Sequence, residues 1–541
     1  MLTNQSIRGN SNRIIGKPSV RTVPRMLTHF TTTVRNRDSR RYFAAYLTGK
    51  MLGVAALLGI IYGLVWYFGA HAGASVMHKA AVQAKDIVNP VNTMWTLVTA
   101  FLVFFMQAGF MMLEAGFART REVSNVLMEC IADTAMCGIL FFAFGFAFMF
   151  GVGNGWIGHQ YFFLNNAPAT YGSTGVAFLA FFLFQFAFAD TASTIVSGAM
   201  VGRTDFKGDL LYSIGVSGFI YPIVGHWIWG PNGWLATMDT PFRDFAGSTV
   251  VHTVGGMLAL TGAIALGPRL GRKFKRDGGG LPPGHDMTIA AVGGVILWFG
   301  WYGFNPGSTL SALDYGGIGR VAANTTLAAC SGALVAMFMV YPRSKKWDVG
   351  ITVNGFLGGL VAITAPCYWV SPAGALIIGA IAAVVVVLGI DFLEWLRIDD
   401  PIGAVAVHGF AGIFGTISIG LFATGQYGVP GPEGADTTSK VAGLFYGGGT
   451  DQLVAQIIGS AVCTGLVLAA GFLLMYAIKL PGLLRISPEG ELEGIDIVEH
   501  GAPAYHPETA YMGYSAIPAG KFEPASKGMV SLSEMETSPT G

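Results

Sequence analysis

The chain has 541 residues, of which 52% are hydrophobic and only 12% are charged. Average soluble proteins carry about a quarter charged residues, so this composition excludes an ordinary soluble fold and indicates a membrane protein. The net charge of +1 argues against a nucleic-acid partner.

The N-terminal region precedes the main apolar runs. Residues 1–50 form a basic extension that should stay in the cytoplasm, and 51–69 are apolar enough to carry the chain across a bilayer. Three interpretations stay open: a signal peptide, because small-x-small patterns suited to cleavage follow at 70–74; a retained extra transmembrane helix; or an organellar transit peptide. Residues 70–90 are expected to form an external linker.

Eleven apolar runs follow and make up a predicted core at 91–480. Runs of this length suit helices that cross the hydrocarbon, and the alternation of a membrane barrel is absent. The predicted spans lie near 91–117, 130–153, 175–201, 210–228, 247–267, 288–305, 318–342, 350–366, 372–392, 402–425 and 452–478.

Lys and Arg are unevenly divided between the connecting loops. The basic loops contain Arg119, Arg121, Arg203, Lys207, Arg269, Arg272, Lys273, Lys275, Arg276, Arg343, Lys345, Lys346 and Arg397, whereas the intervening loops hold Arg243, Arg320 and Lys440. Basic loops face the cytoplasm. The C-terminal tail, 481–541, is therefore predicted to be cytoplasmic.

Two segments of the core repeat one another. Asp244 precedes His252 by eight residues, and Asp400 precedes His408 by the same interval. The copies fall on the fifth and tenth core helices, so each half has five helices and the halves must be inverted. The predicted fold class is an all-α membrane protein: an eleven-transmembrane-helix core of two inverted five-helix repeats plus one extra helix, with an additional N-terminal apolar segment. Inverted repeats are typical of transporters.

His252 and His408 lie inside otherwise apolar helices. Ionisable residues in a membrane are costly, and they usually face a pathway or one another. Two unrelated core histidines bonded to backbone carbonyls are the alternative. A facing pair could share one proton while both rings stay neutral, and would line a narrow polar track. No third ligand has suitable spacing, so we expect no metal, no cofactor and no enzyme activity.

Aromatic residues cluster at several helix ends, where they usually form a membrane-interface belt. Next to Gly, Ser and Gln they suggest a vestibule for a cation. The strings AGFMMLEAGF, TIVSGA, DFAGSTVVH, GWYGFNPGS, GALIIG and DDPIGAVAVHG, in this order between about residues 91 and 507, resemble the ammonium transporter family, which includes methylammonium permeases and Rhesus proteins. The tail string LRISPEGELEGIDIVEHG is similar to that family's cytosolic tail.

The resemblance implies substrate-binding roles for ten residues along one pore. The presence of Trp229 makes the chain more similar to the ammonium-transporter branch of the family than to the Rhesus branch. The matched positions are Trp229, Ser308 and Phe188 at an external recruitment site; Phe188 and Phe304 as a paired aromatic gate; His252 and His408 as twin pore histidines; Asp244 as support for the recruitment site; and Gln185, Trp301 and Thr364 flanking the pore.

The implied function is ammonium transport by a homotrimer in the cell (inner) membrane, with methylammonium as an analogue and a PII-type cytosolic regulator at the tail. Cation–π attraction contributes up to about 2 kcal/mol when partly desolvated. A bare small ion in an apolar wall costs on the order of 20 kcal/mol, so deprotonation would let neutral ammonia pass the histidines. An ammonium sensor with little transport is the alternative.

Two positions depart from the family pattern. Gly202 stands before Arg203 where the family has Glu, which could alter loop contacts to the tail. Asp190 follows Phe188 by two positions, so it should point about 200° away from the gate. We expect a structural role for Asp190, with Thr191 and Thr194 as nearby donors; the alternative is a proton or cation site.

Overall fold

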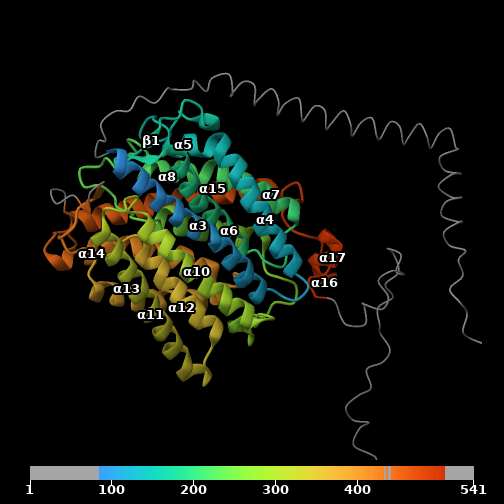
Figure 1. The fold of residues 1–541 in the computed structure, drawn as a ribbon. Coiled ribbons are helices and arrows are strands. Elements are labelled where there is room, and N and C mark those ends of the chain that lie inside the picture. The colour runs from blue at the N-terminus through green and yellow to red at the C-terminus, as the bar shows by residue number, and fades with distance from the viewer. Residues whose placement is uncertain (1–84, 432–433, 436–439, 506–541) are drawn as a thin grey trace, which may run out of the picture. The chain divides into compact units, whose positions relative to one another are not determined.

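The computed structural model describes most of the chain after residue 84 (Figure 1). The described residues are 85–431, 434–435 and 440–505. Ten helices among them are long and apolar enough to cross a membrane, and a further apolar helix, α12, is shorter. The predicted segments at 1–50 and 51–69, and the tail beyond 505, lie outside the described residues. The described chain is a multi-pass helical membrane protein, as its composition predicted.

The spanning helices follow one another along the chain, and four of the spans contain a π-helical turn. The helices are α3 (Lys85–Phe117), α4 (Val123–Leu140), α5 (Phe146–Phe150), α6 (Phe178–Gly198), α7 (Phe206–Gly215), α8 (Tyr221–Trp229), α9 (Val254–Leu266), α10 (Met287–Gly307), α11 (Tyr315–Ser344), α12 (Val349–Thr364), α13 (Pro372–Leu396), α14 (Ala411–Phe422) and α15 (Asp451–Lys479). The π-helical turns are η1 (Phe141–Gly145), η3 (Val216–Ile220), η4 (Ser248–Thr253) and η6 (Val405–Phe410).

Short elements occupy the loops and the tail. Two antiparallel hairpins pair β1 with β2 and β3 with β4. The short elements are β1 (Thr170–Tyr171), β2 (Val176–Ala177), β3 (Pro430–Gly431), β4 (Gly434–Ala435), the 3₁₀ turns η2 (Phe162–Leu164), η5 (Lys275–Asp277) and η7 (Leu444–Tyr446), and the tail helices α16 (Pro488–Glu493) and α17 (Ile495–His500).

The helix boundaries differ from the predicted spans mainly at their starts. Helix α3 begins at Lys85, so residues 85–90 are helical and do not belong to the predicted linker. The second span begins at Val123 rather than near 130. These first turns contain polar and charged residues, so they lie outside the apolar runs from which the spans were predicted.

Capping side chains determine where several helices begin. The carboxylate of Asp286 accepts hydrogen bonds from the backbone N–H groups of Thr288 and Ile289 at the start of α10. Ser371 and Ser487 cap α13 and α16 in the same way. Such caps contribute about 1 kcal/mol each to helix stability.

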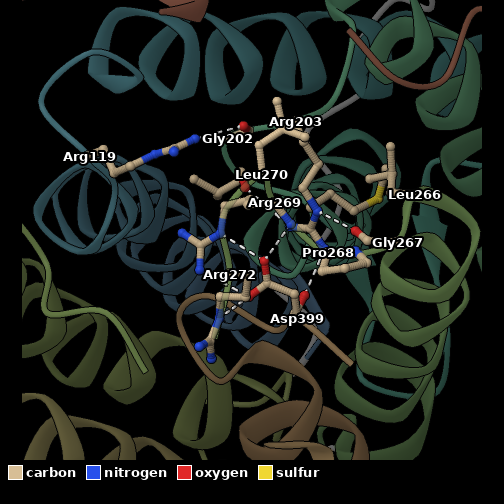
Figure 2. A network of polar contacts seen from close by, with 12 residues as sticks. Arg119, Gly202, Arg203, Leu266, Gly267, Pro268, Arg269, Leu270, Arg272 and Asp399 are labelled. Carbon is tan, nitrogen blue, oxygen red and sulfur yellow. Dashed lines mark hydrogen bonds and ion pairs between the residues drawn. The ribbon is translucent and has the colours of Figure 1, made fainter. Parts of the chain in front are cut away.

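Asp399 organises the loops at the helix ends next to Arg203, which we call the Arg203 side; the opposite ends are the Trp229 side. Arg269 donates to both carboxylate oxygens of Asp399 at 2.8 and 3.0 Å, and Arg203 donates to its carbonyl at 2.7 Å. Figure 2 shows Arg203, Arg269 and Arg272 converging on this residue. Burial would raise the pKa of Asp399, but the bonds from Arg269 and the charges of Arg203 and Arg269 hold it well below its usual range.

The described part of the tail packs against loops of its own chain. The N–H of Ile486 donates to the carbonyl of Arg203 at 3.1 Å, and the N–H of Asn125 donates to Asp496 at 2.9 Å. Arg485 forms an ion pair with Glu491 at 2.8 Å. Up to residue 505, the tail therefore packs against the loop that contains Arg203 and against the start of α4.

Candidate functional site

A hollow on the Trp229 side is lined by side chains from α6, α8 and α10. Its walls include Gln185, Phe188, Trp229 and Ser308. These residues are distant in sequence; the resemblance placed Trp229, Ser308 and Phe188 at the recruitment site and Gln185 beside the pore. The structure brings them together around one space.

Two hydrogen bonds orient the polar groups of this hollow. The indole N–H of Trp229 donates to the carbonyl of Asp244 at 2.7 Å, and the hydroxyl of Ser308 donates to the carbonyl of Phe304 at 2.8 Å. With its proton engaged, the Ser308 oxygen keeps lone pairs that can accept a hydrogen bond. The site therefore offers an aromatic face and an acceptor.

The Asp244 carboxylate is buried, and each of its oxygens accepts two hydrogen bonds. One oxygen accepts from the N–H groups of Gly247 and Ser248 at 2.7 and 3.0 Å. The other accepts from Thr249 and Val250 at 2.8 and 3.0 Å. Burial raises the pKa of Asp244, and these four donors oppose that rise. The side chain holds the beginning of η4, while its carbonyl holds Trp229.

Asp400 repeats this arrangement in the second half of the chain. Its carboxylate accepts from the N–H groups of Ala404 and Val405 at 3.0 and 2.9 Å, at the beginning of η6. Burial raises the pKa of Asp400 to about 7. The sequence repeat thus corresponds to a structural repeat, in which an aspartate caps the π-helical turn that carries a histidine.

Phe188 and Phe304 close the hollow. Their rings stack with centroids 4.0 Å apart, and Phe188 also meets Trp229 edge-on at 6.1 Å. On its other side Phe304 stacks on His252 at 5.4 Å. The two phenyl rings therefore lie between the hollow and the histidines.

The two histidines face each other, as predicted. Their Nδ1 atoms are 3.2 Å apart, and both side chains are buried. The Nε2 atom of His252 has no partner among the described residues. A neutral pair can share one proton between the Nδ1 atoms, which leaves a ring nitrogen for a small polar molecule.

A close helix crossing makes this pairing possible. A Cβ atom at Gly256 would lie 2.6 Å from Cα of Gly409, so α9 and η6 approach more closely than side chains would permit. Small residues serve this purpose in membrane helices. Gly256 lies four positions after His252 in the sequence, about one helical turn further on.

The remaining matched residues surround the histidines. Trp301 stacks on His252 at 5.2 Å, and its indole N–H donates to the hydroxyl of Thr364 at 2.9 Å. Below His408, a narrow cavity is lined by Phe110, Glu114 and Asn354 among others. All ten predicted residues thus lie in or beside one row of side chains from Trp229 to His408.

Asp190 departs from its expected surroundings. It is fully buried and faces protein, as predicted, but its proposed donors are engaged elsewhere. Thr191 donates to the carbonyl of Ala187, and Thr194 donates to the carbonyl of Asp190 itself and to Gln107. Neither carboxylate oxygen of Asp190 accepts a bond of regular hydrogen-bond geometry in the described chain, and the side chains that approach it are those of Thr134 and Gln107. The expected bonding was wrong because the Thr191 hydroxyl donates to its own helix and the Thr194 hydroxyl is directed to a backbone carbonyl and to Gln107.

Sequence reasoning missed four further buried acids near Asp190. Glu129 and Asp133 lie one turn apart on α4, Glu114 lies on α3, and Asp209 lies on α7. Acids at positions i and i+4 within an apolar helix were the available signal. Among the described residues, no group of three or more His, Cys, Asp or Glu side chains could hold a metal ion.

The model of the Ammonium Transporter Family matches residues 94–505. Ammonium transporter Amt2 of Archaeoglobus fulgidus is 45% identical over 426 residues, which cover 77% of this chain and 88% of that protein. Ammonium transporter 1 member 1 of Arabidopsis thaliana is 40% identical over 453 residues, covering 79% and 87%.

Solved structures agree with these sequence relatives. A structure described as a sensor Amt protein has a TM-score of 0.70 and 35% identity, covering 77% of this chain and all of that chain (100%). Mep2 of Saccharomyces cerevisiae has a TM-score of 0.69 and 25% identity, covering 77% and 95%.

Proposed function

Because the chain belongs to the ammonium transporter family, we propose that it recruits ammonium on the Trp229 side, deprotonates it and conducts ammonia past the twin histidines. The Trp229 side is then external. The basic Arg203 side and the tail from residue 481 are cytosolic, in agreement with the distribution of Lys and Arg. The membrane is the cell (inner) membrane.

The hollow at Trp229 suits an ammonium ion. The cation lies against the indole and Phe188, where cation–π attraction contributes up to about 2 kcal/mol after partial desolvation. The oxygen of Ser308 accepts one N–H bond, which potassium cannot offer. Asp244 supports this site indirectly, because its carbonyl holds Trp229 and its carboxylate holds η4.

The stacked pair of Phe188 and Phe304 favours entry of a neutral molecule. A bare ion in such apolar surroundings costs on the order of 20 kcal/mol, whereas ammonia avoids this cost. Past the gate, the ring nitrogens of His252 and His408 are polar groups with which ammonia can exchange hydrogen bonds. The row from Trp229 through the two phenyl rings to the histidines carries this proposal.

Family membership also supports a homotrimer, methylammonium as a second substrate and a PII-type regulator at the tail. Transport is favoured over a sensor, although one structural neighbour is described as a sensor Amt protein. Uptake of radiolabelled methylammonium into proteoliposomes separates the two functions. We expect protein-dependent uptake that ammonium inhibits and potassium does not; ammonium binding without uptake would favour the sensor.

A further inference from the structure

Part of the wall of the Trp229 hollow comes from a loop in the second half of the chain. Val429 and Pro430 line this hollow, together with Phe245 and the recruitment residues. They belong to residues 424–431, which follow α14 and end in β3; we call this stretch the rim segment. Since Val429 and Pro430 are apolar, the rim segment can affect a bound cation only through the shape of the hollow.

Trp369, in the loop between α12 and α13, anchors the rim segment. The indole N–H of Trp369 donates to the carbonyl of Gly428 at 2.8 Å, and the N–H of Thr424 donates to the carbonyl of Trp369 at 2.9 Å. Trp369 is itself buried. These bonds hold the rim segment near the protein but do not join it to the opposite side chains of the hollow.

Arg320 provides a second attachment for the rim segment. Its guanidinium carbon lies 3.4 Å from the ring centroid of Tyr427, two residues before Val429. The same guanidinium lies 4.7 Å from the ring centroid of Tyr368, and its Nε donates to the carbonyl of Tyr368 at 2.9 Å. A planar guanidinium stacks on aromatic rings in this way, and cation–π attraction adds to the contact.

Tyr368 extends this contact to the hollow. Its ring is buried and stacks on Phe245, with centroids 4.8 Å apart and an interplanar angle of 20°. The Tyr368 hydroxyl donates to the carboxylate of Asp314 at 2.6 Å, which fixes the ring. Phe245 lines the hollow. Arg320 therefore joins two parts of the hollow's wall, Phe245 through Tyr368 and the rim segment through Tyr427.

The position of Arg320 depends on these two rings, because no acid holds it. None of the ion pairs in the described part of the chain includes Arg320. One of its terminal nitrogens is buried without a hydrogen-bond partner among the described residues, whereas buried polar groups nearly always have one. Stacking on Tyr427 also covers a ring face that could otherwise attract a second cation.

We propose that Arg320 is a positioning residue: it sets the width of the hollow between Phe245 and the rim segment, and so makes the recruitment site discriminate ammonium from its larger methylated analogues. This inference rests on the proposed recruitment and transport of ammonium. Without Arg320, the rim segment keeps its bonds to Trp369 but loses its connection to Phe245, so the hollow can widen. The phenyl gate and the histidines are not touched by this change.

The test measures uptake of ammonium and of radiolabelled methylammonium by the full-length protein in proteoliposomes, and compares Arg320→Ala with the wild type. The ratio of the KM for methylammonium to the KM for ammonium should fall about tenfold, the lower end of what one carbon atom contributes in a closely fitting pocket. The maximal rate of ammonium uptake should not change.

Variants at Tyr427 separate the ring contact from the charge of Arg320. Tyr427→Phe keeps a ring beside the guanidinium and should keep the wild-type ratio, whereas Tyr427→Ala should lower the ratio as Arg320→Ala does. In the double variant Arg320→Ala/Tyr427→Ala the two effects should not add, because both remove the same contact. Lys440→Ala is the matched control: it removes an exposed positive charge from the same side of the chain and should leave the ratio unchanged.

The ratio also identifies the outcomes that would overturn the proposal. If both KM values of Arg320→Ala change by the same factor, Arg320 acts through its charge and does not set the width. If the maximal rates for both cations fall equally at an unaltered ratio, Arg320 is only a structural residue. Val429→Leu tests the same wall without changing Arg320, so it serves even where Arg320→Ala fails to fold. Its added bulk should raise the ratio, and an unchanged ratio would contradict the proposal.

Binding measurements distinguish a failure of this inference from a failure of the proposed function. A wild type that binds both cations but transports neither would refute transport. The Kd values for ammonium and methylammonium, measured by isothermal titration calorimetry on the full-length protein in detergent, would still test Arg320. The ratio of these Kd values should fall about tenfold in Arg320→Ala, and an equal ratio in the two proteins would refute the positioning role by itself.

Discussion

The carboxylate of Glu122 occupies the space that a side chain at residue 202 would need. A Cβ atom at Gly202 would lie 2.6 Å from one Glu122 oxygen, and the backbone there has a φ of +83°. Glu122 pairs with Arg119, which in turn donates to the carbonyl of Gly202 at 3.0 Å. Where the family has Glu before the arginine, this chain supplies the carboxylate from the loop before α4.

Gly202→Ala should therefore destabilise the protein by about 1–2 kcal/mol from the left-handed backbone alone, with a further loss from the clash. The measurement is thermal unfolding of the purified protein in detergent. The double variant Gly202→Ala/Glu122→Ala removes the clash but not the backbone strain. Full additivity of the two changes would contradict the proposed contact.

Asp244→Ala should abolish transport, because four backbone N–H groups lose their acceptor and each buried, unsatisfied group costs about 1–3 kcal/mol. Uptake and size-exclusion profiles of the variant are the measurements. Asp348→Ala, which removes an exposed cap from α12, is the control and should transport normally. Normal uptake by Asp244→Ala would show that its role is misassigned.

His252→Ala should lower the selectivity for ammonium over potassium about tenfold or more, equivalent to 1.4 kcal/mol, since it removes the partner of His408 and one wall of the pore. Currents with either cation measure this ratio. His285→Ala changes a histidine distant from the pore row and should leave selectivity unchanged. Unaltered selectivity in His252→Ala would place the conduction route elsewhere.

Asp399 should make stability depend on pH in acid. Its pKa is depressed in the folded state, so the native protein binds fewer protons than the unfolded chain. The stabilisation is complete above the usual value of about 4 and is lost as the pH falls below it. Asp399→Asn should thus melt lower than the wild type at neutral pH, with the difference shrinking below about pH 4. A constant difference would refute the ion-pair interpretation.

Deletion of residues 510–541 should leave uptake intact. The described tail contacts end at Tyr505, whose hydroxyl meets His285 at 3.2 Å. The comparison is uptake per mole of folded protein, with a deletion from residue 484 as the control that removes the packed tail. Loss of activity in the shorter deletion would assign a role to that segment.

Sequence patterns predicted the spans, the repeat and the row of site residues because these depend on local composition and fixed spacing. The facing of His252 and His408 followed from their equal offsets from Asp244 and Asp400. By contrast, the hydrogen bonding of Asp190 depends on the rotamers of Thr191 and Thr194, whose hydroxyls both donate to backbone carbonyls. The contact between Glu122 and the backbone at Gly202 depends on two loops that meet in space, and no local sequence pattern encodes it.

The π-helical turns at the two histidines impose a length constraint on the chain. The N–H of His252 bonds to the carbonyl of Gly247, five residues back, so η4 contains one residue more than an α-helical turn would. Deleting a single residue between Asp244 and His252 would allow an ordinary α-helix and swing the imidazole by about 100° around the axis. Side chains in this interval can be exchanged more readily than the interval can be shortened, and the same holds for the interval of eight positions that separates His408 from Asp400.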